Sequence, residues 1–115
     1  MAVQPVRSFR GRWRIVSSEL WDRHYLDLEK PAHITFERDG IGTLSFGVVR
    51  GWIDYRINER DGMPYVEFSW EGHSDTDPSC GRGWAAMPGK ELVGRLFIHN
   101  GDDSAFVAVK ERRAR

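Results

Sequence analysis

The sequence predicts an all-β protein, an eight-stranded antiparallel up-and-down barrel with one short helix after the first strand. Two observations carry this prediction. Apolar and polar residues alternate with a period of two in short segments, which is typical of strands that bury one face. Dipeptides that supply positive φ, such as Asp61-Gly62 and Asn100-Gly101, end several of these segments, as tight hairpin turns require. The same pattern leaves a β-sandwich as the alternative.

The expected strands follow one another at regular spacing along the whole chain. In the N-terminal half, the alternating apolar positions are, in order, Trp13 and Ile15; Ile34 and Phe36; Leu44, Phe46 and Val48; and Ile53, Tyr55 and Ile57. In the C-terminal half they are Val66, Phe68 and Trp70; Trp84 and Ala86; Leu92, Leu96 and Ile98; and the run from Phe106 to Val109.

Residues 17–30 interrupt this alternation and predict the helix. Ser18 is a residue type that caps helices, Trp21, Tyr25 and Leu28 follow at helical spacing, and Pro31 would stop the helix. An irregular extended stretch is the alternative, because residues 26–29 also alternate. We expect the helix to cover an open end of the barrel.

The composition fits a single folded domain over residues 1–115, with residues 1–8 and 111–115 expected to be flexible. Apolar residues make up 40% of the chain, including five Trp and six Phe, which is enough for a core. No apolar run approaches the roughly 20 residues that cross a bilayer, so no membrane partner is expected. The single cysteine, Cys80, and the absence of a visible secretory signal predict a cytoplasmic protein.

The charges balance, with 17 basic and 17 acidic residues, so a dedicated nucleic-acid binder is not expected. The basic residues nevertheless gather at the two ends of the chain, from Arg7 to Arg14 and from Lys110 to Arg115. If the first and last strands are neighbours, these residues form a basic seam. Polyanion binding along that seam is a further alternative, and it predicts steep salt dependence.

The inward-facing residues are bulky and almost uncharged, which suits an apolar ligand in a small barrel. The leading functional hypothesis is therefore a non-enzymatic binding protein that holds a small, largely apolar molecule in the barrel or at its mouth. The candidate ligand-binding residues are Trp13, Phe36, Phe46, Tyr55, Phe68, Trp70 and Phe106.

A row of outward polar residues is the basis of the alternative hypothesis, a protein-interaction or adaptor module, in its simplest form a homodimer. The row comprises Asp54, Arg56, Glu67, Glu71, Arg82, Arg95 and His99. If consecutive strands pair, Arg56 faces Glu67, and Arg82 faces Arg95 or Glu71. With Trp52 and Phe97 nearby, the row has the mixed charged and aromatic character of a recognition surface.

The sequence assigns no catalytic residue, metal or cofactor. The segment Asp75-x-Asp77-x-Ser79 opens like a calcium loop, but Cys80 and Ala86 occupy the positions where such a loop needs Gly and Glu. Residues His73 and Cys80 lack the paired spacing of a zinc site. An enzyme remains a minor alternative, with His73, Cys80, His99 and Asp102 around one end of the barrel.

Two resemblances follow from short motifs. Gly11-Arg12-Trp13, at the start of the first strand, resembles the calycin superfamily of lipocalins and fatty-acid-binding proteins. That resemblance implies that Trp13 plugs one end of the barrel and packs against a basic residue of the last strand, Lys110 or Arg112. Four further blocks are similar to those of small bacterial cytoplasmic proteins without an assigned activity: Leu20-Trp21-Asp22, residues 68–72 (FSWEG), residues 81–84 (GRGW) and residues 98–106 (IHNGDDSAF).

Overall fold

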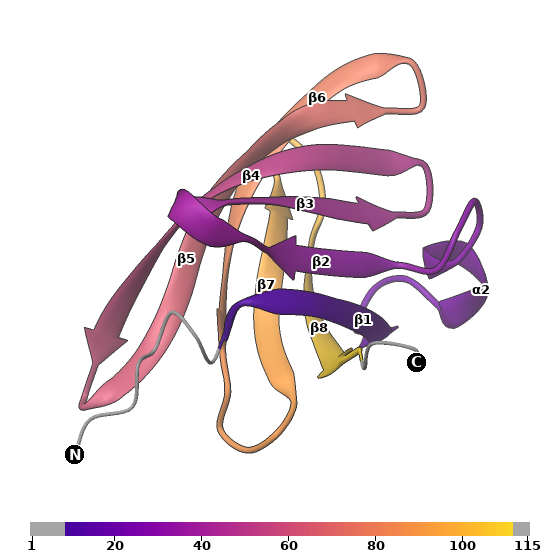
Figure 1. Cartoon of the computed structure of the whole chain (residues 1–115). Coiled ribbons are helices and arrows are strands. Elements are labelled where there is room, and N and C mark those ends of the chain that lie inside the picture. The colour runs from indigo at the N-terminus through magenta and orange to yellow at the C-terminus, as the bar shows by residue number, and fades with distance from the viewer. Residues whose placement is uncertain (1–8, 112–115) are drawn as a thin grey trace.

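The computed structural model of the chain describes residues 9–111, which form a closed barrel of eight antiparallel strands (Figure 1). Each strand pairs with the next along the chain, and the last pairs with the first, which confirms the up-and-down barrel and excludes the sandwich. The strands are β1 (Gly11–Ser18), β2 (His33–Phe36), β3 (Ile41–Phe46), β4 (Val49–Arg60), β5 (Met63–Ser74), β6 (Asp77–Ala86), β7 (Leu92–Ile98) and β8 (Asp103–Lys110). The ends predicted to be flexible were residues 1–8 and 111–115. Residues 1–8 and 112–115 lie outside the described residues.

The seam between β1 and β8 closes the barrel. Trp13 lies opposite Lys110 in this pairing, and the register shifts between Ile15 and Ser17. The first and last strands are therefore neighbours, as the basic-seam hypothesis requires. Two of the seam arginines are ion-paired, however: Arg12 with Glu111 at 2.7 Å and Arg14 with Asp27 at 2.8 Å.

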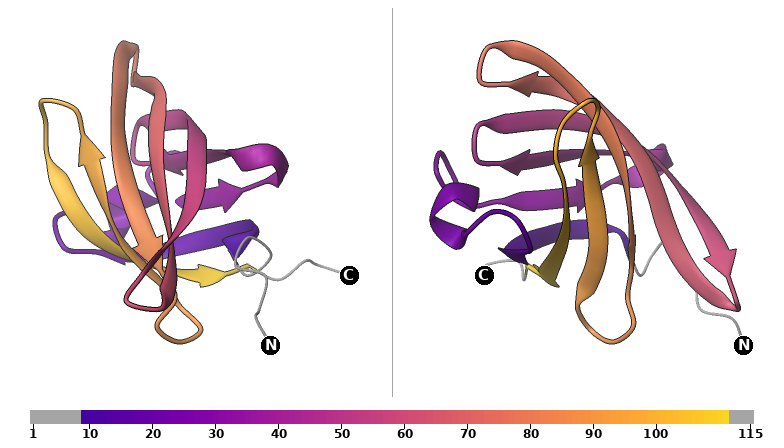
Figure 2. Two further views of the ribbon diagram at one scale, coloured as in Figure 1. Left: turned by 90° about the vertical axis from the view of Figure 1, so that its left-hand side faces the viewer. Right: turned by 180° about the vertical axis from the view of Figure 1, so that it is seen from behind.

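The β4–β5 hairpin is the longest in the barrel, and Figure 2 shows it projecting past its neighbours at the end opposite the helix. Its turn is the expected Asp61-Gly62 pair, with φ of 53° and 78°. Positive φ at both central residues matches the right-handed twist of the flanking strands, so this turn fixes the β4–β5 register. Because β3 pairs with β4 only as far as Asp54, the last part of β4 lies beyond the β3 strand.

The helix after β1, α2 (Arg23–Leu26), covers one end of the barrel, as expected, but it is shorter than the sequence suggested. Its N-cap is Asp22, whose carboxylate accepts a 2.9 Å hydrogen bond from the backbone N–H of Tyr25. The prediction of Ser18 as the cap is therefore wrong; Ser18 lies in β1. Leu28, which was expected on the buried helical face, is 52% exposed because the helix ends before it. A short 3-10 turn, η1 (Arg38–Gly40), follows β2.

Small residues make room for large ones across the interior. The indole of Trp70 lies between Gly51 of β4 and Gly81 of β6. Gly81 is its register partner, and Gly51 lies two residues from its partner on β4, Ile53. A Cβ atom on Gly51 would lie 2.7 Å from Trp70 Cε3, and one on Gly81 would lie 2.8 Å from Trp70 Nε1. Glycine is needed at Gly51 because the ring occupies that volume, and at Gly81 because the ring and the backbone oxygen of Phe97 both occupy it.

Candidate functional site

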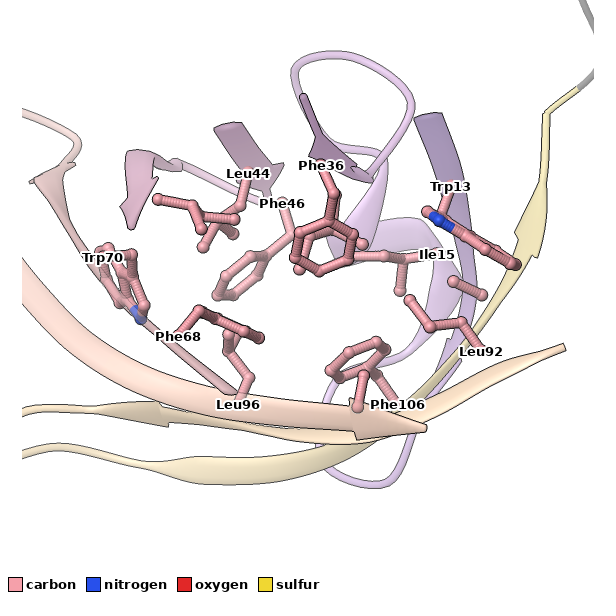
Figure 3. Close-up of a cluster of buried hydrophobic side chains, with 14 of the residues drawn as sticks. Trp13, Ile15, Phe36, Leu44, Phe46, Phe68, Trp70, Leu92, Leu96 and Phe106 are labelled. Atoms are coloured by element: carbon pink, nitrogen blue, oxygen red, sulfur yellow. The ribbon is translucent and has the colours of Figure 1, made fainter. Parts of the chain in front are cut away.

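The seven residues assigned to a ligand all lie in the barrel interior, where none is more than 5% exposed. Figure 3 shows most of them pointing toward one another from strands on both sides of the barrel. The rings of Phe36, Tyr55 and Phe68 pack edge to face, with centroids 5.0 and 6.1 Å from Phe36. Burial raises the pKa of Tyr55, whose hydroxyl donates a hydrogen bond to the backbone oxygen of Glu37.

Almost no space remains between these side chains. The cavity bordered by Ile15, Phe46 and Phe106 has a volume of about 10 Å³. A buried water needs at least about 10–15 Å³ of such volume. This hollow is therefore too small for an apolar ligand unless the side chains around it move.

One end of the barrel is closed by a cluster around Trp13. The indole N–H donates a 2.9 Å hydrogen bond to the backbone oxygen of Phe9, which is itself fully buried. The ammonium of Lys110 lies over the indole and also donates to the backbone oxygen of Arg10. Of the two basic residues that the calycin resemblance offered, Lys110 makes this contact, and Arg112 lies outside the described residues. Burial lowers the pKa of Lys110.

The opposite end is closed by α2 and the segment that leads into it. Trp21 packs on Phe46 with ring centroids 4.9 Å apart, and Leu26 is 2% exposed. The backbone N–H of Gly47 donates a 2.9 Å hydrogen bond to the backbone oxygen of Leu26, which ties the β3–β4 turn to the helix. The helix thus acts as a fixed cover of the barrel end.

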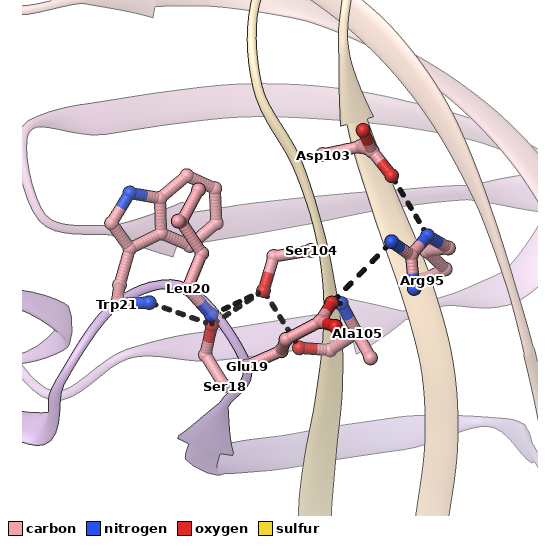
Figure 4. Close-up of polar contacts among 8 residues, drawn as sticks. All are labelled: Ser18, Glu19, Leu20, Trp21, Arg95, Asp103, Ser104 and Ala105. Carbon is pink, nitrogen blue, oxygen red and sulfur yellow. Dashed lines mark hydrogen bonds and ion pairs between the residues drawn. The ribbon is translucent and has the colours of Figure 1, made fainter.

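A polar cluster holds the chain in place beside this cover (Figure 4). The hydroxyls of Ser18 and Ser104 lie 2.7 Å apart, and Ser104 Oγ accepts a 3.0 Å hydrogen bond from the backbone N–H of Leu20. Arg95 lies 3.3 Å from Glu19 and 2.8 Å from Asp103. These contacts join the segment after β1 to β8 and hold it against the barrel.

The predicted polar row lies on the outer face of β4–β7, except for His99, which follows β7 in the turn to β8. Arg56 and Glu67 are register partners, as expected. Arg56 nevertheless pairs with Asp54 of its own strand, whereas Glu67 accepts hydrogen bonds from Asn58 and the Tyr65 hydroxyl at 3.1 and 3.2 Å. Most of the row is therefore satisfied within the protein.

Arg82 departs from the expected pairing. Its neighbours across β5 and β7 are Ser69 and Phe97, not Glu71 or Arg95. The guanidinium lies over the Phe97 ring, 5.1 Å from its centroid. The expectation that Arg82 faces another charged residue is wrong because the β6–β7 register places Trp84 opposite Arg95.

An apolar hollow lies on this face, between the projecting β4–β5 hairpin and β6–β7. We call it the outer groove and define it by the side chains of Arg60, Met63, Tyr65, Arg82, Trp84 and Phe97. Its volume is about 430 Å³, within the range of small-molecule sites. Met63 and Trp84 are 51% and 42% exposed, an unusual exposure for large apolar side chains gathered in one place.

Sequence reasoning missed four of the groove residues, namely Arg60, Met63, Tyr65 and Trp84. The alternation along each strand could have found them. Met63 and Tyr65 lie on the face of β5 opposite to that of the buried Val66, and Trp84 lies on the face of β6 opposite to that of the buried Ala85. Knowing which outward residues meet requires the inter-strand register, which places Glu67 beside Trp84 and Arg82 beside Phe97.

The residues of the enzyme alternative do not assemble into a catalytic arrangement. The backbone N–H of His99 donates to the backbone oxygen of Cys80 at 2.7 Å, and His73 Nδ1 lies 2.9 Å from the backbone oxygen of Asp75. The first contact joins the backbones of β6 and of the turn after β7, and the second holds the His73 side chain to the β5–β6 turn. Over residues 9–111, no group of three or more His, Cys, Asp or Glu side chains lies close enough to hold a metal ion.

Comparison with known proteins gives no relative: no family model, no curated protein and no solved structure matches this chain. Within the part of the chain that the structure describes, no helix is long and apolar enough to cross a membrane. The assignment of function therefore depends on the geometry of the barrel and of the outer groove.

Proposed function

We propose that this protein is a non-enzymatic binding protein that holds a small, largely apolar molecule in the outer groove. The observation that supports this proposal is the contrast between two volumes, about 10 Å³ in the interior and about 430 Å³ in the groove. A ligand of that size would need the core to rearrange before it could enter the barrel, but it could enter the groove directly.

The chemistry of the groove suits such a molecule. Trp84, Tyr65 and Phe97 present aromatic surface from three neighbouring strands, and Met63 adds a flexible thioether at the hairpin end. Aromatic and apolar walls with a few polar groups are typical of small-ligand sites. Because the walls stand on paired strands, the site is formed before the ligand arrives.

Native mass spectrometry of the gently desalted protein tests this proposal, with two matched variants. We expect a bound mass on the wild-type protein that is lost on denaturation and is absent from Trp84→Ala. The control is Trp52→Ala, because Trp52 is an exposed tryptophan on the same sheet but outside the groove, 63% exposed. Extra mass that persists in Trp84→Ala, or a bare wild-type mass even after incubation with apolar fluorophores, would count against the groove.

A protein partner, in its simplest form a second copy of this chain, is the second candidate. It is supported by the exposed Trp52 and by a shallow hollow that continues the same outer face over Asp54, Arg56 and Ser69. Light scattering over a wide concentration range tests it. A strict monomer at high concentration, together with an unchanged profile in Trp52→Ala, would oppose the homodimer.

Two further expectations from the sequence, a calycin-like barrel and a cytoplasmic location, belong with these proposals. The contact of Lys110 with Trp13 supports a calycin-like barrel, since that resemblance implied a basic residue of the last strand over the tryptophan. The single cysteine, Cys80, is exposed, which fits the reducing conditions of a bacterial cytoplasm.

A further inference from the structure

We infer that the outer groove takes an organic anion, an aromatic body that carries one acidic group, and that Arg82 binds the acidic group. This inference rests on the proposed function and adds the charge of the ligand and the residue that reads it. It goes beyond the general expectation of an apolar molecule, for which no charged contact is needed.

Across the described residues, several arginines of the outer face are paired with carboxylates, and two are not. Arg50, Arg56 and Arg95 each have a carboxylate partner, namely Glu29, Asp54 and both Glu19 and Asp103. Among residues 9–111, no carboxylate lies within ion-pair distance of Arg60 or Arg82. Both of these arginines line the outer groove, one near each end.

Aromatic rings hold both of these arginine side chains in place. The Arg60 guanidinium lies 5.0 Å from the ring centroid of Tyr65, and that of Arg82 lies 5.1 Å from the centroid of Phe97. Stacking on a ring fixes the plane of a guanidinium, while its N–H groups point outward from the edge of that plane. A carboxylate can accept two parallel hydrogen bonds from such an edge.

The two arginines differ in the acidic residues that lie near them. Asp61 lines the hairpin end, directly after Arg60 in the chain, whereas the cross-strand neighbours of Arg82 are the uncharged Ser69 and Phe97. Glu67, between the two ends, already accepts two hydrogen bonds from neutral donors. Asp54 and Glu67 share a hollow with Arg82, but Asp54 is paired with Arg56 and Glu67 has these two donors. Arg82 is therefore the cation of this end that an incoming anion meets.

The surface next to Arg82 is aromatic. Trp84 follows Arg82 on the outer side of β6, and the ring of Phe97 lies beneath the guanidinium. An acidic group at Arg82 therefore places the rest of the ligand along Trp84 and Tyr65, where the contact is apolar and aromatic.

Two fluorescent probes with the same ring system test this inference. The first is 1-anilinonaphthalene-8-sulfonate, which is anionic, and the second is N-phenyl-1-naphthylamine, which lacks the sulfonate. We expect the wild-type protein to bind the anionic probe about tenfold more tightly than the neutral one, as one charge-assisted hydrogen-bonded contact allows. Arg82→Gln should abolish this difference, because the anionic probe then binds no more tightly than the neutral one.

The matched control is Arg56→Gln, the same substitution on the same face at an arginine that is already paired with Asp54. It should retain the full preference for the anion, and circular dichroism should show that both variants fold. Equal affinity of the two probes for the wild-type protein, or an anion preference that survives Arg82→Gln, overturns the inference. If both probes bind equally and Trp84→Ala weakens both, the inference fails while the proposed function stands; if Trp84→Ala affects neither probe, both fail.

Discussion

The ammonium group of Lys110 lies 4.7 Å from the centroid of the Trp13 ring and donates a 2.7 Å hydrogen bond to the backbone oxygen of Arg10. One side chain of the last strand therefore holds both the plug of the barrel and the segment that leads into the first strand. Burial lowers the pKa of Lys110, and these two contacts offset the cost of holding its charge there.

Replacement of this lysine should destabilise the barrel. Lys110→Met keeps the aliphatic stem but removes the cation over Trp13 and the hydrogen bond to Arg10, so we expect a loss of about 1–2 kcal/mol in the free energy of unfolding. Denaturant titration followed by tryptophan fluorescence measures it. The control is Lys90→Met in the exposed β6–β7 loop, which should change stability little; equal effects of the two variants would contradict this account.

The glycines that face Trp70 should not tolerate a side chain. Gly51→Ala places a Cβ atom 2.7 Å from the indole, so the ring or the strand must shift. Overpacking of this kind costs about 1–3 kcal/mol of unfolding free energy. Gly89→Ala is the control, because no atom lies within 4 Å of its added Cβ. Thermal melts of the two variants make the comparison, and an unshifted Gly51→Ala would mean that the interior is looser than its packing indicates.

Truncation of a core ring should open a cavity that the compact interior cannot fill. Phe68 is 5% exposed, and Phe68→Ala should lower the free energy of unfolding by about 3–5 kcal/mol. Phe97→Ala on the outer face should cost less, because part of that ring is already in contact with water. Similar losses in chemical denaturation would show that the two rings are equally important to the fold.

His33 should make stability depend on pH. Burial lowers the pKa of His33 below 6.5, and the nearby Arg12 guanidinium lowers it further. The unfolded chain therefore takes up a proton at a higher pH than the folded barrel does. The contribution of His33 is fully present above pH 6.5 and is lost as the pH falls through the lowered pKa of the folded state.

Melting temperatures between pH 8 and pH 5 test this relationship. The wild-type protein should lose stability toward acid, and His33→Gln should remove part of that slope. His24→Gln, at an exposed position on α2, should keep the wild-type slope. A slope that is unchanged in His33→Gln would assign the pH dependence to other groups.

Much of the fold could be read from the sequence because it depends on local patterns. Alternation placed Phe36, Phe68 and Trp70 on the inner face, and Asp61-Gly62 formed the expected turn. The helix cap was misassigned because Ser18 and Asp22 are both good capping residues, and only the end of β1 decides between them.

The site depends on relationships that no single segment contains. The lack of an interior cavity follows from the way side chains of all strands interdigitate, with Trp70 set against two glycines from other strands. Arg56 binds Asp54 rather than its register partner Glu67 because the nearer carboxylate lies on its own strand. The groove exists only because the registers of β5, β6 and β7 bring Tyr65, Trp84 and Phe97 to one face.

The seam between β1 and β8 also governs how the chain reaches this structure. Every other strand pair joins neighbours in sequence, whereas the Lys110 contact with Arg10 spans 100 positions and the Ser18–Ser104 contact spans 86. Local hairpins can form early, but the ring of hydrogen bonds closes only when both termini meet, and closure of so long a loop is slow. Until then β1 and β8 are free edges that can pair with other chains, so aggregation during refolding should depend on protein concentration and be worsened by loss of β8.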